Sequence, residues 1–166
     1  MILGAVLLAA LQVGSAVTAD GKLLPASEAA VLAGARACVG ATVDPAGQDA
    51  RLTGWPSVIG SDADKDPSGA AKRVASKDGV RLVVATGVDG GCVVDARGDA
   101  AFGPTRFYAD LGKQVGVTID KAKPVVDLPN GELMVVQVGA EKGVQYIQLV
   151  VANRNGKYAK KYSKGN

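Results

Sequence analysis

Histidine is absent from this chain of 166 residues. Its absence removes the usual general base, the commonest metal ligand and the Ser-His and Cys-His nucleophile pairs. The sequence also contains no Gly-x-Ser-x-Gly elbow, no Ser-x-x-Lys pair and no Gly-Lys-Ser/Thr phosphate loop. We therefore expect no cofactor, no metal ligand and no catalytic residue of these types. The enzymatic alternative that is left is a small envelope hydrolase that uses two carboxylates.

Aromatic residues are scarce, at 4% of the chain, whereas glycine occurs 22 times. A core with few aromatic residues must be built mainly from Val, Leu, Ile and Ala, and the many glycines indicate a framework rich in turns. Both features favour a sheet over a helical bundle. The length of the chain and its 48% of hydrophobic residues suit one domain with one core.

Charged residues are missing from the first 19 positions, and the first one is Asp20. The apolar run of residues 2–13 has the length of a signal-peptide core, and the small residues up to Ala19 suit a cleavage site. No Lys or Arg lies near Met1, which departs from the usual pattern. We expect residues 1–19 to be a cleaved signal peptide and residues 20–166 to be a single domain without a transmembrane segment. An uncleaved anchor is the alternative.

The chain has two cysteines, Cys38 and Cys92. An export signal implies an oxidising compartment, in which an even number of cysteines usually forms disulfides. We therefore predict a disulfide between Cys38 and Cys92. Two buried free thiols are the alternative.

Three segments have the start and stop signals of helices. They run from Ser27 to Gly40, from Asp44 to Gly54 and from Pro104 to Gly116. Cys38 falls on the apolar stripe of the first helix, so a bond from there to a sheet is geometrically sensible. Trp55 directly follows the second helix, and we expect it to pack against the last turn of that helix rather than to stack on a ligand.

Six runs rich in apolar and β-branched residues predict strands: residues 70–76, 80–86, 91–97, 117–128, 133–138 and 144–152. A helix is the alternative for the first run. Asp78-Gly79 and Asp89-Gly90 predict tight turns between the first three runs. Pro124 indicates an edge strand, whereas the last run is apolar on both faces and should be central. The expected fold is α+β: an antiparallel sheet of about five to six strands in two meanders, with two to three helices packed on it.

An Asp-x-Asp-x-Asp run, formed by Asp62, Asp64 and Asp66, resembles the opening of a calcium loop. The comparison fails at the sixth and twelfth positions, where Pro67 and Arg73 stand in place of Gly and Glu. We expect a solvated acidic turn here, and a weak calcium site of another type is the alternative.

The end of the chain is strongly basic, with six Lys or Arg and no acid from Lys142 onward. Within the basic tail, residues 153–166, lysines are interleaved with tyrosines. The residues expected to contact an anionic surface are Lys157, Tyr158, Lys160, Lys161, Tyr162 and Lys164. Nucleic acid is not an expected partner, because the chain is expected to be exported. A frayed, solubilising terminus is the alternative.

The leader, the helix with Cys38, the Gly54-Trp55 pair and Cys92 within VDGGCVVD together resemble small exported proteins of unknown function from Gram-negative bacteria. The resemblance implies a periplasmic location and a structural disulfide, and it implies no activity. We therefore expect a non-catalytic periplasmic or secreted accessory protein that binds an anionic envelope surface or another envelope protein.

Overall fold

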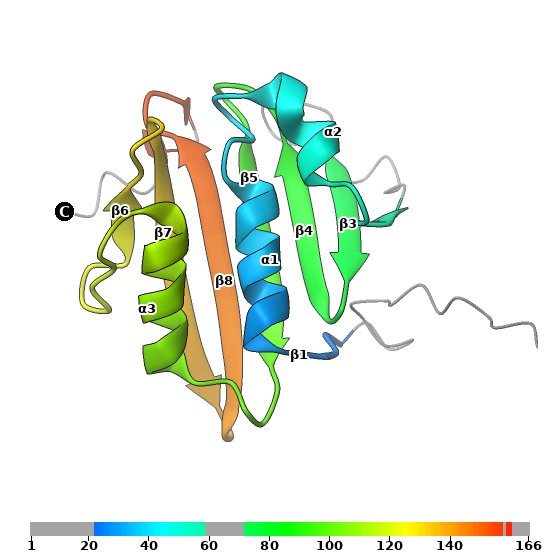
Figure 1. Ribbon diagram of the computed structural model, residues 1–166, viewed down its shortest axis with the longest axis vertical. Coiled ribbons are helices and arrows are strands. Elements are labelled where there is room, and N and C mark those ends of the chain that lie inside the picture. The colour runs from blue at the N-terminus through cyan, green and yellow to red at the C-terminus, as the bar shows by residue number, and fades with distance from the viewer. Residues whose placement is uncertain (1–21, 59–71, 158, 161–166) are drawn as a thin grey trace, which may run out of the picture.

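A computed structural model describes residues 22–58, 72–157 and 159–160 of the chain. In this part, three helices pack on one face of an antiparallel sheet, so the predicted α+β class is confirmed (Figure 1). The helices are α1 (Glu28–Cys38), α2 (Gln48–Arg51), which follows the 3-10 turn η1 (Pro45–Gly47), and α3 (Pro104–Val115). The strands are β1 (Pro25–Ala26), β2 (Ser57–Val58), β3 (Arg73–Lys77), β4 (Val80–Ala85), β5 (Gly91–Gly98), β6 (Val125–Asp127), β7 (Glu132–Glu141) and β8 (Val144–Asn153).

The sheet joins two meanders through their last strands. Its order is β2-β3-β4-β5-β8-β7-β6, and all neighbours in this order are antiparallel. The short strand β1 adds a parallel pair to the end of β5. As predicted, β6 lies at an edge and β8 is central. The seven antiparallel strands of this order, or eight with β1, slightly exceed the expected five to six, because β1 and β2 are additional strands of two residues each.

Local sequence signals account for the ends of the helices. The hydroxyl of Ser27 accepts a hydrogen bond from the backbone N–H of Ala30 and caps α1 (3.2 Å). Gly116 ends α3 in the left-handed conformation, with φ of 77°, which glycine adopts without a steric penalty. Gly34 faces Val80 and Val94, and a Cβ atom there would lie 3.0 Å from Val80. The lack of a side chain at Gly34 therefore lets α1 lie close to β4 and β5.

The main core lies between the helices and the sheet. It is formed by fully buried side chains from both layers, among them Val31, Leu82, Phe107, Leu111 and Leu149. Each large apolar side chain contributes about 1.5–3 kcal/mol when it is buried in this way. Trp55 is only 9% exposed and belongs to the same cluster, so it is a core residue, as the predicted packing role requires.

The connection between β4 and β5 differs from the predicted two-residue turn at Asp89-Gly90. It is a loop of residues 86–90 in which Gly87 has a positive φ (100°) and neither Asp89 nor Gly90 does. The carboxylate of Asp89 instead accepts a hydrogen bond from the backbone N–H of Lys157 (3.2 Å). The loop still contains a local turn, in which the N–H of Gly90 donates to the carbonyl of Gly87 (2.9 Å), so its central residues are Val88 and Asp89 rather than Asp89 and Gly90. By contrast, Asp78 and Gly79 both have positive φ, as predicted for a tight turn.

The strand predicted at residues 117–128 is also wrong in its length, since β6 covers only Val125–Asp127. Asp120 accepts a hydrogen bond from the backbone N–H of Ala122 (2.9 Å), so a side-chain turn interrupts the run. Strands β7 and β8 are longer than predicted, because Lys142 and Gly143 connect them in a tight turn. The second helix is shorter than predicted and starts as a 3-10 turn. The run at residues 70–76 is a strand from Arg73 onward.

Candidate functional site

The sheet face opposite the helices, here called the open face, carries a straight row of polar side chains. Cross-strand pairing places these residues directly opposite one another in five neighbouring strands. From β3 to β7, this polar row consists of Ser76, Arg81, Asp95, Gln148 and Gln137. The residues next to them in sequence, such as Leu82, Val94 and Leu149, point into the main core. Because side chains alternate along a strand, the polar row points away from the helices.

Asp95 joins the centre of the polar row. One carboxylate oxygen accepts a hydrogen bond from Arg81 (3.0 Å) and the other accepts one from Gln148 (3.0 Å). The side chain of Asp95 is 17% exposed, whereas that of Arg81 is 46% exposed. The carboxylate of Asp95 is therefore mostly covered, whereas the guanidinium of Arg81 is accessible to solvent. Three strands hold this network, so its geometry is fixed before any ligand arrives.

An exposed aromatic ring lies beside the polar row. Tyr146 is 44% exposed and stands directly opposite Arg97 on one side and Gly139 on the other. Gly139 has no side chain to cover the ring. Together with Leu23 and most of the polar row, Tyr146 and Gly139 line an open groove of about 630 Å³. The groove thus combines one aromatic surface with hydrogen-bonding groups in a fixed row.

On the other side of the polar row, six valines form a second row across the sheet. This valine row consists of Val74, Val83, Val93, Val150, Val135 and Val125. Val135 and Val150 are almost completely buried in a second apolar cluster, to which Ala159 of the C-terminal segment contributes a side chain with no exposed surface. The start of the basic tail therefore packs on the open face beside Val135 and Val150, and the described residues leave the groove accessible.

The predicted anionic-contact residues have different environments. Lys157 pairs with Asp89 at 3.6 Å, and its side chain is 75% exposed. Lys160 is exposed. Arg154, at the start of the tail, pairs with Asp127 (3.0 Å). The other predicted residues, Tyr158, Lys161, Tyr162 and Lys164, lie outside the described side chains, as do Asp62, Asp64 and Asp66 of the acidic run.

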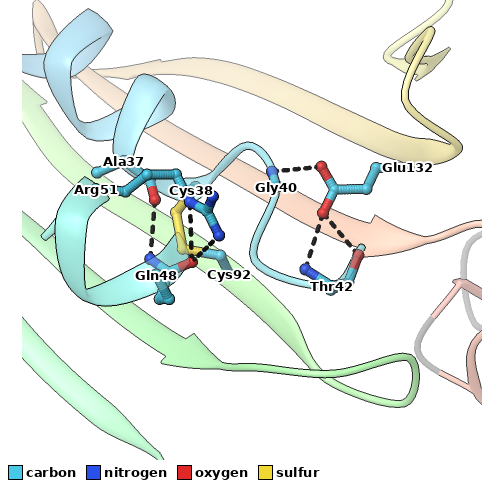
Figure 2. The surroundings of a disulfide bond; sticks show 8 residues. All are labelled: Ala37, Cys38, Gly40, Thr42, Gln48, Arg51, Cys92 and Glu132. Atoms are coloured by element: carbon cyan, nitrogen blue, oxygen red, sulfur yellow. Dashed lines mark hydrogen bonds between the residues drawn. A yellow bond between two sulfur atoms is a disulfide. The ribbon is translucent and has the colours of Figure 1, made fainter. Parts of the chain in front are cut away.

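The predicted disulfide between Cys38 and Cys92 is present and links the end of α1 to β5 (Figure 2). The two Cα atoms lie 5.3 Å apart, and neither cysteine has any exposed surface. The side chain of Gln48 lies beside the disulfide and donates a hydrogen bond to the carbonyl of Ala37 (3.0 Å). The bond is therefore part of the core and no reagent can reach it from the surface of the folded chain.

Glu132, at the start of β7, is a fully buried carboxylate that sequence reasoning missed. One oxygen accepts hydrogen bonds from the backbone N–H and the hydroxyl of Thr42 (3.0 and 2.6 Å), and the other accepts from the N–H of Gly40 and the amide of Asn130 (2.7 and 2.8 Å). Figure 2 shows the carboxylate facing the loop that follows α1, beside the disulfide. Four donors therefore compensate the cost of burying the charge.

Three acids line a second depression, of about 370 Å³, between the first turns of α1 and α3. They are Glu28, Asp99 and Asp110. Arg106 binds Glu28 at 2.8 Å, and this carboxylate raises the pKa of the guanidinium; Asp110 pairs with Lys113 (3.0 Å). Two of the three acids are thus engaged by cations. Among the described residues, no group of three or more acids and cysteines could hold a metal ion.

Two other groups titrate away from their ordinary range. Burial raises the pKa of Tyr108, which lines a groove of about 600 Å³ between α3 and the loop that follows it. A hydrogen bond from Arg51 (2.8 Å), with the N–H of Gly47, lowers the pKa of Asp44. Neither group lies near the polar row in sequence or in the strand register.

Comparisons with protein-family models, with curated proteins and with solved structures each found no match. In the described ranges, none of the helices combines the length and the apolar character that crossing a membrane requires.

Proposed function

We propose that the protein is a non-catalytic binding protein of the periplasm or the extracellular space, and that its binding surface is the groove on the open face. The observation that carries this proposal is the combination of an exposed Tyr146 with the fixed network of Arg81, Asp95 and Gln148. The groove is wide and open, as suits a surface that contacts a large partner. Binding sites typically place a few oriented polar groups beside apolar or aromatic side chains.

Export is supported by two features. Residues 1–19 are uncharged, and the Cys38–Cys92 disulfide is of the kind that persists in oxidising compartments. The resemblance to small exported proteins of Gram-negative bacteria favours the periplasm. Intact-mass analysis of the exported protein should show a chain that begins at Asp20. A mature chain that still carries Met1 would contradict the proposed cleavage.

The basic tail is proposed as a second contact, with an anionic envelope surface. Ala159 holds the start of the tail on the sheet, next to the exposed Lys157 and Lys160. The body therefore presents these lysines at a fixed place. Each lysine near an anionic membrane adds up to about 1 kcal/mol of attraction, which salt screens.

The alternative function, a carboxylate hydrolase, would use the acids between α1 and α3. The depression there contains Glu28, Asp99 and Asp110, but Arg106 holds Glu28 in an ion pair. A general acid must be free to reach the leaving group, whereas the ion pair with Arg106 occupies the carboxylate of Glu28. This arrangement suits a contact that joins two helices better than it suits acid–base chemistry.

The test is retention of the mature protein on washed, insoluble envelope material from a Gram-negative bacterium. The wild type should sediment with the material, and Tyr146→Ala combined with Gln148→Ala should reduce its retention at every salt concentration. The tail variant, with Lys157, Lys160, Lys161 and Lys164 changed to Gln, should lose only the part of the retention that salt weakens. Absence of wild-type retention would contradict the proposal, and release of soluble products from the material would favour the hydrolase.

A further inference from the structure

We propose that the groove on the open face binds a neutral polysaccharide chain. This inference rests on the proposed binding function and names the chemistry of the ligand. Four properties of the groove carry it: its charge balance, its hydrogen-bonding groups, its exposed aromatic ring and its open shape.

The charges of the side chains that line the groove cancel; Arg97, which stands opposite Tyr146, is not among these lining residues. Arg81 and Asp95 are the charged residues among those that line it, and they pair with each other. The remaining polar side chains are those of Gln137, Tyr146 and Gln148. Anion sites present unpaired cations, and cation sites present unpaired carboxylates. A ligand that matches this groove is therefore uncharged.

The hydrogen-bonding groups suit hydroxyls. The amide of Gln137 offers two N–H donors and an acceptor, and Arg81 adds further donors. The amide of Gln148 offers its acceptor and one N–H, because its other N–H donates to Asp95. A hydroxyl is likewise both a donor and an acceptor. Within the described part of the chain, neither the amide of Gln137 nor the hydroxyl of Tyr146 bonds to another residue, so both are available to a ligand. A surface that carries both hydrogen-bond donors and acceptors can therefore bind the hydroxyls of a polysaccharide.

Tyr146 supplies an apolar platform. Tyr146 is paired across the strands with Gly139, where even an added Cβ atom would meet no atom within 4 Å, so the space above Gly139 is open. A pyranose ring has one face of C–H groups, which can lie on an aromatic ring while its hydroxyls point sideways. The row of Arg81, Asp95, Gln148 and Gln137 runs beside the ring, where such hydroxyls would be.

The shape favours a chain over a single sugar. Neighbouring strands are about 4.8 Å apart, so the polar row from Arg81 to Gln137 extends about 14 Å across four strands. The groove is open, so a polymer can enter and leave along the row. We infer that the glycan crosses the strands, with successive sugars over β4, β5, β8 and β7.

The experiment uses four neutral hexasaccharides: cellohexaose, laminarihexaose, maltohexaose and the hexamer of N-acetylglucosamine. Isothermal titration with the oxidised mature protein should detect saturable binding of at least one of them. With that sugar, Tyr146→Ala should bind about tenfold more weakly, since the ring contact is lost. Tyr146→Phe keeps the ring and should retain most of the affinity. Val88→Ala, which changes an exposed apolar side chain outside the groove, should bind like the wild type.

Chemical-shift mapping on the wild type provides a readout that needs no variant. Addition of the sugar should shift the amide signals around Tyr146, Gln148, Asp95 and Gln137, and should leave those of α1 and α3 unchanged. Shifts confined to the helices, or no saturable binding of any of the four sugars, would overturn the inference. If the sugars fail while Tyr146→Ala with Gln148→Ala still reduces retention on envelope material, the binding function stands with another ligand. If both fail, both proposals are wrong.

Discussion

Glu132 is the residue whose replacement should reveal most about the stability of this fold. Glu132→Gln keeps the shape of the side chain but turns one acceptor oxygen into an amide donor. Two of the four hydrogen bonds, either those from Thr42 or those from Gly40 and Asn130, then lose their acceptor. Hydrogen bonds to a charged group contribute about 1.5–3 kcal/mol each, so the loss of two should lower the free energy of unfolding by about 3–6 kcal/mol.

Urea unfolding of the oxidised protein measures this loss directly. The midpoint should fall while the slope with denaturant stays the same, because the two chains expose the same surface on unfolding. The melting temperature should drop by roughly 10 °C. Thr42→Val removes one of the four donors and should cost about 1–2 kcal/mol.

Glu141→Gln is the matched control, since it makes the same change at the exposed end of the same strand. It should change the free energy of unfolding by less than about 0.5 kcal/mol. If Glu132→Gln proves as mild as Glu141→Gln, the buried carboxylate does not stabilise the loop after α1, and the reasoning is wrong.

Two further predictions concern the disulfide and Tyr108. Replacement of Cys38 and Cys92 by Ala opens a loop of 54 residues and should cost about 4 kcal/mol in urea unfolding; a loss under about 1 kcal/mol would contradict this. Because burial raises the pKa of Tyr108, the native state holds its proton more tightly, so stability should fall as the pH rises above 10.0, the ordinary value. Tyr108→Phe should unfold with a weaker dependence on pH in this alkaline range, and an unchanged dependence would refute the assignment.

The parts of the fold that were predictable depend on short-range signals. Ser27 caps α1 through an N–H three residues away, and Gly116 ends α3 by its own backbone conformation. Apolar residues on both faces of the run 144–152 correctly predicted that β8 is a central strand. The Asp89-Gly90 signal misplaced the turn between β4 and β5 by one residue: the turn is closed between Gly87 and Gly90, and Asp89 also accepts a hydrogen bond from the backbone of Lys157.

The polar row could not be assembled from the sequence. Asp95 binds Arg81, 14 residues before it, and Gln148, 53 residues after it. The second contact requires the register between β5 and β8, which joins the two meanders and leaves no local trace. Glu132 is a similar case, since a Glu after a Pro-Asn-Gly turn has the pattern of an exposed residue, and its donors at Thr42 lie 90 residues away. The alternation of Tyr146 and Gln148 in β8 was the one signal that could have pointed to the groove.

The arrangement of these sites predicts that stability and binding are separable. Glu132 stabilises one end of β7, and Gly139, opposite Tyr146, lies seven residues further along the same strand, about 24 Å away. Substitutions this far apart usually add without coupling. The double variant Glu132→Gln, Tyr146→Ala should therefore lose stability as the sum of the single losses, to within about 0.5 kcal/mol, and should bind as weakly as Tyr146→Ala alone. Urea unfolding and sugar titration of the four chains test this. A coupling above about 1 kcal/mol, or weaker binding by Glu132→Gln alone while it is fully folded, would mean that the buried carboxylate also positions the groove.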